Sequence, residues 1–131
     1  YFIDIDEYGC AVAVSEAITD PDVPLLLGVT PTYVAVGERV RPERPVAAGA
    51  AIGAALVRQK IPNLSEVDVT SPEDVVIRTS DGIRVLAGSV DGIEERVRLL
   101  DSILASVREQ EMRVDYIDVR VEAKPVIRPR R

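Results

Sequence analysis

Two carboxylates near the start of the chain are the residues whose spacing comes closest to a catalytic or metal site. Asp4 and Asp6 lie two positions apart, and alternate side chains of an extended strand point to the same face. A pair of carboxylates on one face is what a hydrolase or an oxygen-ligand cation site needs. A polar strand face beside a turn explains the pair equally well.

The other residue types that carry chemistry are missing or poorly placed. The sequence has no histidine, which is the commonest general base and metal ligand at neutral pH. Its single cysteine, Cys10, lies beside alanine and valine, which favours a small buried apolar role over a nucleophile. Gly82, Gly88 and Gly92 lack the compact spacing of a phosphate-binding loop. We therefore expect no enzyme activity, no catalytic residue, no metal and no cofactor.

Composition and charge narrow the class of protein. A chain of 131 residues with 47% hydrophobic residues can build one core. The net charge of −6 would repel a phosphate backbone, so we expect no nucleic-acid partner. We predict one domain over residues 1–123 and a basic tail over residues 124–131. That tail is either solvated or attracted to an anionic surface.

Neither a membrane span nor a cleavable signal is expected within the chain. The longest uncharged apolar run, residues 46–57, has 12 residues, and about 20 are needed to cross a bilayer. The chain opens on strand-like residues without a basic start. The segment could have been cut from a longer protein.

The first third of the sequence predicts a hairpin and then an irregular stretch. Residues 2–6 and 10–14 alternate as two strands, and Gly9 suits the left-handed position of the turn between them. Residues 19–45 hold five prolines and predict a long irregular excursion. Within it we expect two short strands, at Leu25–Leu27 and at residues 33–36.

The alanine-rich residues 46–60 predict a helix that begins after Pro45 and ends before Pro62. Gly49 and Gly53 share one face of this helix. In a soluble protein that spacing allows a close approach to a sheet, whereas in a membrane it would indicate helix dimerisation.

The rest of the sequence predicts three strands, a second helix and a last strand. Residues 66–70, Val75–Thr79 and residues 83–87 alternate as strands, with a turn at Asp81 and Gly82. Asp91 is a plausible N-cap for an amphipathic helix whose apolar stripe runs from Ile93 to Val107. Residues 113–121 form the last strand, which Pro125 and Pro129 keep from extending. We therefore predict an α+β fold, a mostly antiparallel sheet with two main helices packed on it.

Four features of the second half resemble the β domain of the bacterial cell-division proteins FtsQ and DivIB. They are the hairpin at residues 81–88, the helix from Asp91, the strand at residues 116–120 and the tail at residues 125–128. In the first half, residues 5–9 are similar to the family's turn, and residues 23–28 to the proline-leucine-glycine segment that follows it. The chain departs from the family pattern at Glu94 and Glu95, where members usually carry a basic residue, and at Val121, where some carry an aromatic residue.

The resemblance implies a non-enzymatic divisome component that helps regulate septal peptidoglycan synthesis. It implies a single-pass membrane protein in which an N-terminal transmembrane helix, absent from this chain, anchors a polypeptide-transport-associated domain and then the β domain on the extracytoplasmic side. A few residues of that β domain can precede Tyr1. The implied partners are the membrane proteins FtsL and FtsB or DivIC.

We predict that the last strand binds the partner by β-augmentation, because an edge strand presents unpaired backbone groups. Tyr116 would offer a flat apolar surface, and Arg120 would fork onto a partner carboxylate, unless Asp118 and Arg120 form a cross-strand ion pair within the domain. Val126 and Ile127 form an exposed apolar pair or fold back. The predicted partner-binding residues are Tyr116, Ile117, Asp118, Val119, Arg120, Val121, Val126 and Ile127, of which Ile117, Val119 and Val121 would anchor the strand to the core.

The alternative is a small-ligand-binding regulatory α/β module in which residues 19–45 act as a lid over one sheet face. It predicts a deep enclosed pocket with converging polar groups and a covered last strand.

Overall fold

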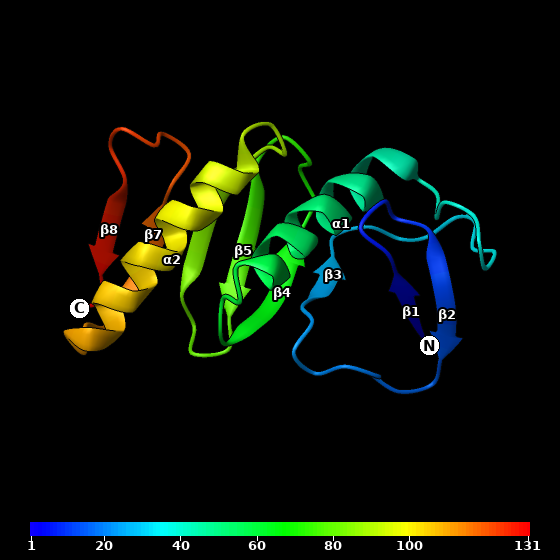
Figure 1. Ribbon diagram of the computed structural model, residues 1–131, viewed down its shortest axis with the longest axis horizontal. Coiled ribbons are helices and arrows are strands. Elements are labelled where there is room, and N and C mark those ends of the chain that lie inside the picture. The colour runs from blue at the N-terminus through cyan, green and yellow to red at the C-terminus, as the bar shows by residue number, and fades with distance from the viewer.

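The computed structural model describes residues 1–131 and contains one six-stranded sheet, one two-stranded sheet and two helices (Figure 1). The six strands lie in the order β3-β4-β5-β6-β7-β8, and β1 pairs with β2. Pairing is parallel for β3 with β4 and for β6 with β7, and antiparallel for the other neighbours. The predicted α+β class is confirmed. The elements are β1 (Phe2–Ile5), β2 (Ala11–Ser15), β3 (Leu25–Leu27), α1 (Glu43–Arg58), β4 (Leu64–Asp68), β5 (Val75–Thr79), β6 (Arg84–Gly88), α2 (Ile93–Glu109), β7 (Val114–Asp118) and β8 (Val126–Pro129).

The N-terminal hairpin forms as expected. Gly9 has a φ of +84°, the left-handed conformation that the turn requires. The Asp6 carboxylate accepts the backbone N–H groups of Tyr8 and Cys10, each at 2.9 Å, and so closes the turn.

The proline-rich segment contains one of its two predicted strands. Leu25–Leu27 forms β3 beside β4, but the strand predicted at residues 33–36 is wrong. Tyr33 makes a single bridge to Arg41, and the chain then turns where the Glu38 N–H donates to the Ala35 carbonyl. The turn removes these residues from any ladder before a strand can develop.

Helix α1 begins at Glu43, three residues earlier than predicted. Pro45 lies in its first turn, where its missing N–H has no intrahelical partner to lose. A Cβ added at Gly49 would overlap Leu26 Cδ1, so this glycine does allow the helix to approach the sheet closely. Gly53 has no such neighbour within 4 Å and faces open space.

The start of α2 differs from the prediction. Gly92, with φ +71°, precedes the helix, and no side chain caps it, so the N-cap role predicted for Asp91 is wrong. Arg96 holds this loop instead. Its buried guanidinium donates from Nε to the Ala87 carbonyl at 2.8 Å, from Nη1 to the Asp91 carbonyl at 2.6 Å, and also to the Ser89 carbonyl. A buried charge with three acceptors is well satisfied.

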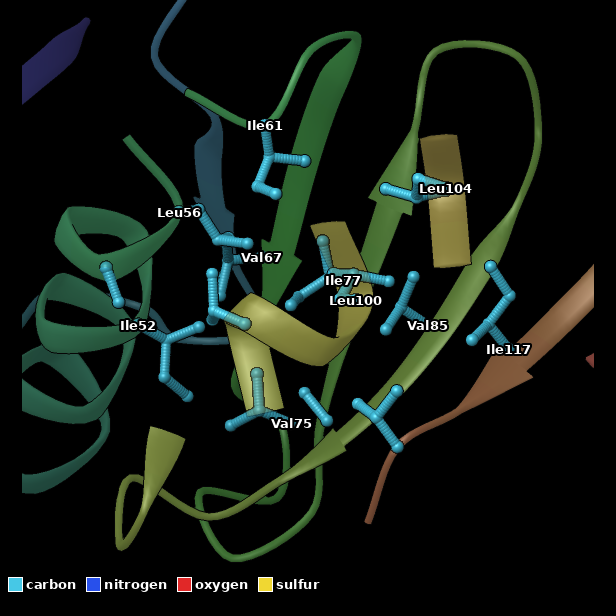
Figure 2. Packing of buried hydrophobic residues seen from close by; sticks show 14 of the residues in the cluster. Ile52, Leu56, Ile61, Val67, Val75, Ile77, Val85, Leu100, Leu104 and Ile117 are labelled. Carbon is cyan, nitrogen blue, oxygen red and sulfur yellow. The ribbon is translucent and has the colours of Figure 1, made fainter. Parts of the chain in front are cut away.

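Most of the buried apolar side chains form one core between the helices and one face of the large sheet. This main core contains 19 buried residues. Figure 2 shows Ile52 and Leu56 of α1 meeting strand residues such as Val67 and Ile77. A second cluster under the N-terminal hairpin has only three buried residues, Ala11, Val40 and Val46. Neither helix is long and apolar enough to cross a membrane.

Candidate functional site: a strand edge at the C-terminus

Strand β7 lies inside the sheet and has no free edge. It pairs with β6 on one side and β8 on the other, so that Tyr116 lies between Arg84 and Arg128. The prediction that residues 113–121 form the last, exposed strand is therefore wrong. The chain reverses after β7 in a turn where the Lys124 N–H donates to the Val121 carbonyl at 3.0 Å.

The edge belongs to β8, the last strand of the sheet order (Figure 1). Its residues, Val126–Pro129, fell within the predicted basic tail, yet they fold back and extend the sheet. All four are exposed, and the predicted apolar pair remains accessible, with Val126 46% and Ile127 37% exposed. Pro129 is compatible with an edge strand because its missing donor can face solvent.

The hydrogen bonds of β8 show which of its backbone groups point outward. The Arg130 N–H donates inward to the Arg113 carbonyl at 2.9 Å. Successive residues of a strand direct their N–H and C=O groups to opposite sides. Arg128 and Val126 therefore face β7, while the N–H and C=O of Ile127 point away from the sheet. A partner strand would meet these groups of Ile127 first.

Asp118 and Arg120 form an ion pair with each other. Arg120 donates from Nε to Asp118 Oδ1 at 3.0 Å and from Nη2 to Asp118 Oδ2 at 2.8 Å, and its backbone N–H also reaches Oδ1 at 3.0 Å. Asp74 lies 3.5 Å from Arg120 Nη1. The hydrogen bond from Arg120 lowers the pKa of Asp118, and the same bond raises the pKa of Arg120. The guanidinium fork predicted for a partner is thus already occupied within the domain, by Asp118 of its own strand segment and also by Asp74, which lies just before β5.

The remaining predicted contact residues divide into core and surface. Ile117 and Val119 are 0% and 1% exposed and anchor the strand as expected. Val121 is 61% exposed, so its predicted anchoring role is wrong, because the turn after β7 carries it out of the core. Tyr116 is half-buried, with the guanidinium carbon of Arg84 5.8 Å from its ring centroid. Its ring is therefore partly covered.

The carboxylate pair and the cysteine have local explanations. Asp4 accepts a hydrogen bond from the Thr19 hydroxyl at 2.9 Å, and Asp6 accepts the turn amides described above. Cys10 is half-buried and forms a single bridge with Arg39. No group of three or more histidine, cysteine, aspartate or glutamate side chains gathers as a metal ion would need.

The excursion at residues 19–45 borders an open, mostly apolar groove, whereas the small-ligand alternative requires a deep enclosed pocket with converging polar groups. Its residues line a groove of about 710 Å³ together with β1 and α1. The same alternative expects the strand predicted at residues 113–121 to be covered, and β7 is indeed paired on both sides, whereas the exposed edge belongs to β8. The exposed edge favours an interaction module.

Comparison with protein families supplies the identity that the geometry alone leaves open. The model of the family described as "Cell division protein FtsQ/DivIB, C-terminal" matches residues 2–120. The chain belongs to the FtsQ/DivIB family. None of the curated proteins matches the sequence significantly. FtsQ/DivIB proteins are non-enzymatic scaffolds of cell division, so the chain has a role in cell division.

The matched region ends at Arg120, before β8 begins. The family match therefore covers the strands and helices that support β8 but not β8 itself. That β8 forms the edge follows from the strand pairing. The sequence carried a signal for this edge, because Val126 and Ile127 are two β-branched residues bounded by prolines.

Proposed function

We propose that this FtsQ/DivIB domain is a divisome scaffold and regulator of septal peptidoglycan synthesis that binds an FtsB/DivIC-type or FtsL-type membrane partner by β-augmentation at β8. The observation that carries the proposal is the outward N–H and C=O of Ile127 on an exposed edge strand. A partner strand would complete the ladder with these groups and gain apolar contact with Val126 and Ile127.

The side chains of β8 would set the register of a bound partner strand. Directly opposed residues share a face, so Val126 and Arg128 lie with Asp118 and Tyr116 on the face away from the core. Ile127 is opposite Ile117, whose side chain is buried in the core beneath the helices. A partner strand with an apolar residue beside Ile127 and an acidic residue beside Arg128 would fit both faces.

The same proposal includes a location. A longer, membrane-anchored form of the protein would hold this domain on the extracytoplasmic side, where the partners' extracytoplasmic segments meet it. The family assignment supports this arrangement.

The test is the affinity for the extracytoplasmic segment of an FtsB/DivIC-type partner, measured by isothermal titration calorimetry. Ile127→Pro removes the outward N–H but leaves the inward bonds of Val126 and Arg128 in place, so it should weaken binding about threefold to tenfold. Ile127→Val keeps the N–H and serves as the matched control with near wild-type affinity.

Two other positions are poor tests of this edge. A proline at Val119 would remove the N–H that donates to the Leu86 carbonyl at 3.1 Å and would damage the sheet itself. Tyr116→Ala changes a ring that Arg84 already partly covers. If folded Ile127→Pro binds the partner segment as tightly as Ile127→Val, β8 is not the augmentation edge.

A further inference from the structure

Two prolines mark the ends of β8, Pro125 just before the strand and Pro129 as its last residue. At the Pro129 end, the Arg130 N–H donates toward β7, to the Arg113 carbonyl at 2.9 Å, and the Arg130 side chain donates to the Gly82 carbonyl at 3.2 Å. The C=O and N–H of one trans peptide group point in opposite directions. The Pro129 carbonyl, which shares its peptide group with the Arg130 N–H, therefore points away from the sheet.

The Pro125 end of the strand has the same arrangement. Val126 is paired with Asp118 of β7, and its N–H is directed toward that strand. The Pro125 carbonyl shares a peptide group with this N–H, so it points to the free side of β8.

The free edge of β8 is consequently rich in acceptors and poor in donors. It presents the carbonyls of Pro125, Ile127 and Pro129. Proline has no N–H, so the N–H of Ile127 is the one outward donor that residues 125–129 contain. A strand that pairs with this edge must supply most of the donors itself.

This shortage of donors separates a second copy of the chain from a different strand. Two β8 edges bring one outward N–H each, so their residues 125–129 form at most two hydrogen bonds in any register. Where two copies align on Ile127, each Pro125 carbonyl would face a Pro129 carbonyl without a donor between them. A strand without proline has an outward N–H at every second residue and can form four hydrogen bonds, three as donor and one as acceptor.

The side chains around this edge also disfavour a second copy. Residues 124–131 carry four basic residues and no acid. Arg128 and Arg130 are exposed, and antiparallel pairing of two copies would place their positive charges side by side. Like charges on neighbouring strands destabilise the pairing.

We propose that Pro125 and Pro129 are specificity-determining residues that prevent β8 from pairing with a second copy of this chain. They leave the edge to a strand of another protein that has an N–H opposite each proline. The inference rests on the proposed binding role of β8 and adds which strands this edge accepts. Because two carbonyls of such a partner receive no donor from β8, the prolines also weaken partner binding, but less than they weaken self-pairing.

Self-association of the 131-residue chain, followed by sedimentation equilibrium, tests the rejection of a second copy. Pro125→Ala combined with Pro129→Ala restores two donors on each edge and should lower the dissociation constant of a dimer at least about a hundredfold. Each single variant restores one donor and should give a gain of about tenfold. Pro62→Ala, at an exposed proline in the loop before β4, is the matched control and should remain monomeric like the wild type.

Hydrogen exchange then locates the contact. The amide of Ile127 should be protected in the dimer of the double variant and should exchange quickly in the monomeric wild type. Circular dichroism of every variant checks that the fold is retained.

Affinity for the extracytoplasmic segment of an FtsB/DivIC-type partner measures the other side of the specificity. The double variant gives donors to two more carbonyls of the partner strand, so it should bind this segment about threefold to tenfold more tightly. That gain is smaller than the gain in self-association. The ratio of partner affinity to self affinity should therefore fall when the prolines are replaced.

Several results would overturn the inference. They are a double variant that stays monomeric, a wild type that dimerises through β8, a dimer in which the Ile127 amide is unprotected, and a gain in partner affinity as large as the gain in self-association. Sedimentation needs no partner, so the inference can fail while Ile127→Pro still weakens partner binding. A partner that binds without β8 would contradict the proposed function and leave the sedimentation result unchanged.

Discussion

The two ends of the six-stranded sheet are built in different ways. At the C-terminal end, β8 is exposed on an edge that the 19-residue main core supports through β7. At the other end, β3 borders an open groove, and the hairpin across it has a cluster of three buried residues. The first edge is ready to accept a strand through its backbone. The second borders an apolar groove, and its hairpin has less packing to hold it in place.

This difference in core size predicts unequal costs of cavity formation, and this is the largest effect we expect. Leu100→Ala in the main core should lower the free energy of unfolding by about 2–5 kcal/mol. Val46→Ala in the small cluster removes about two methylene equivalents and should cost about 1–2 kcal/mol. Urea unfolding followed by circular dichroism measures both. Equal losses in the free energy of unfolding would contradict the difference in core packing between the two ends of the sheet.

The two glycines of α1 test how closely this helix approaches β3 at the groove end of the sheet. Gly53→Ala should raise the free energy of unfolding by about 1 kcal/mol, because alanine favours the helix and its Cβ meets no neighbour. Gly49→Ala gains the same propensity, but its Cβ would displace Leu26. We therefore expect Gly49→Ala to be the less stable of the two in thermal denaturation. The opposite order would mean that α1 does not approach β3 as closely as described.

The smallest effect concerns the ion pair between Asp118, at the end of β7, and Arg120. The pKa of Asp118 is lowered in the folded state by its hydrogen bond from Arg120, so the pair stabilises the fold above the unfolded pKa of about 3.9. That stabilisation is lost as pH falls through the lowered pKa. Asp118→Asn should therefore be less stable than the wild type by about 0.2–1 kcal/mol at pH 7, because Arg120 is exposed and solvent screens the pair. Thermal unfolding from pH 7 to pH 2 should show the difference disappearing in acid, and a constant difference would contradict the assignment.

Much of the fold is readable from local patterns. The turn at Asp81 and Gly82, the apolar stripe of α2 and the Gly9 hairpin depend on neighbours close in sequence, so their residue types are sufficient to predict them. The position of Arg96 in the sequence indicates its buried role, because it lies three residues after Ile93 on the apolar stripe. A charged residue at such a position predicts a buried partner, here three carbonyl groups.

The candidate site was less predictable because it depends on long-range pairing. Pro125 and Pro129 predict the end of regular structure, but Pro125 precedes and Pro129 ends a short strand whose partner is β7. Because of that pairing, the free edge lies at Ile127 and not at Tyr116 as predicted, and Val121 points outward. Similarly, no local pattern shows that β1 and β3 border one groove, since α1 brings them together.

Backbone hydrogen exchange of the domain, alone and with the extracytoplasmic segment of an FtsB/DivIC-type partner, tests the central claim most directly. If β8 is the augmentation edge, the amide of Ile127 exchanges quickly in the free domain and is protected in the complex, while the amides of Ile3 and Leu26 are unchanged. An Ile127 amide that exchanges equally fast in both states, with the partner bound, would contradict the account.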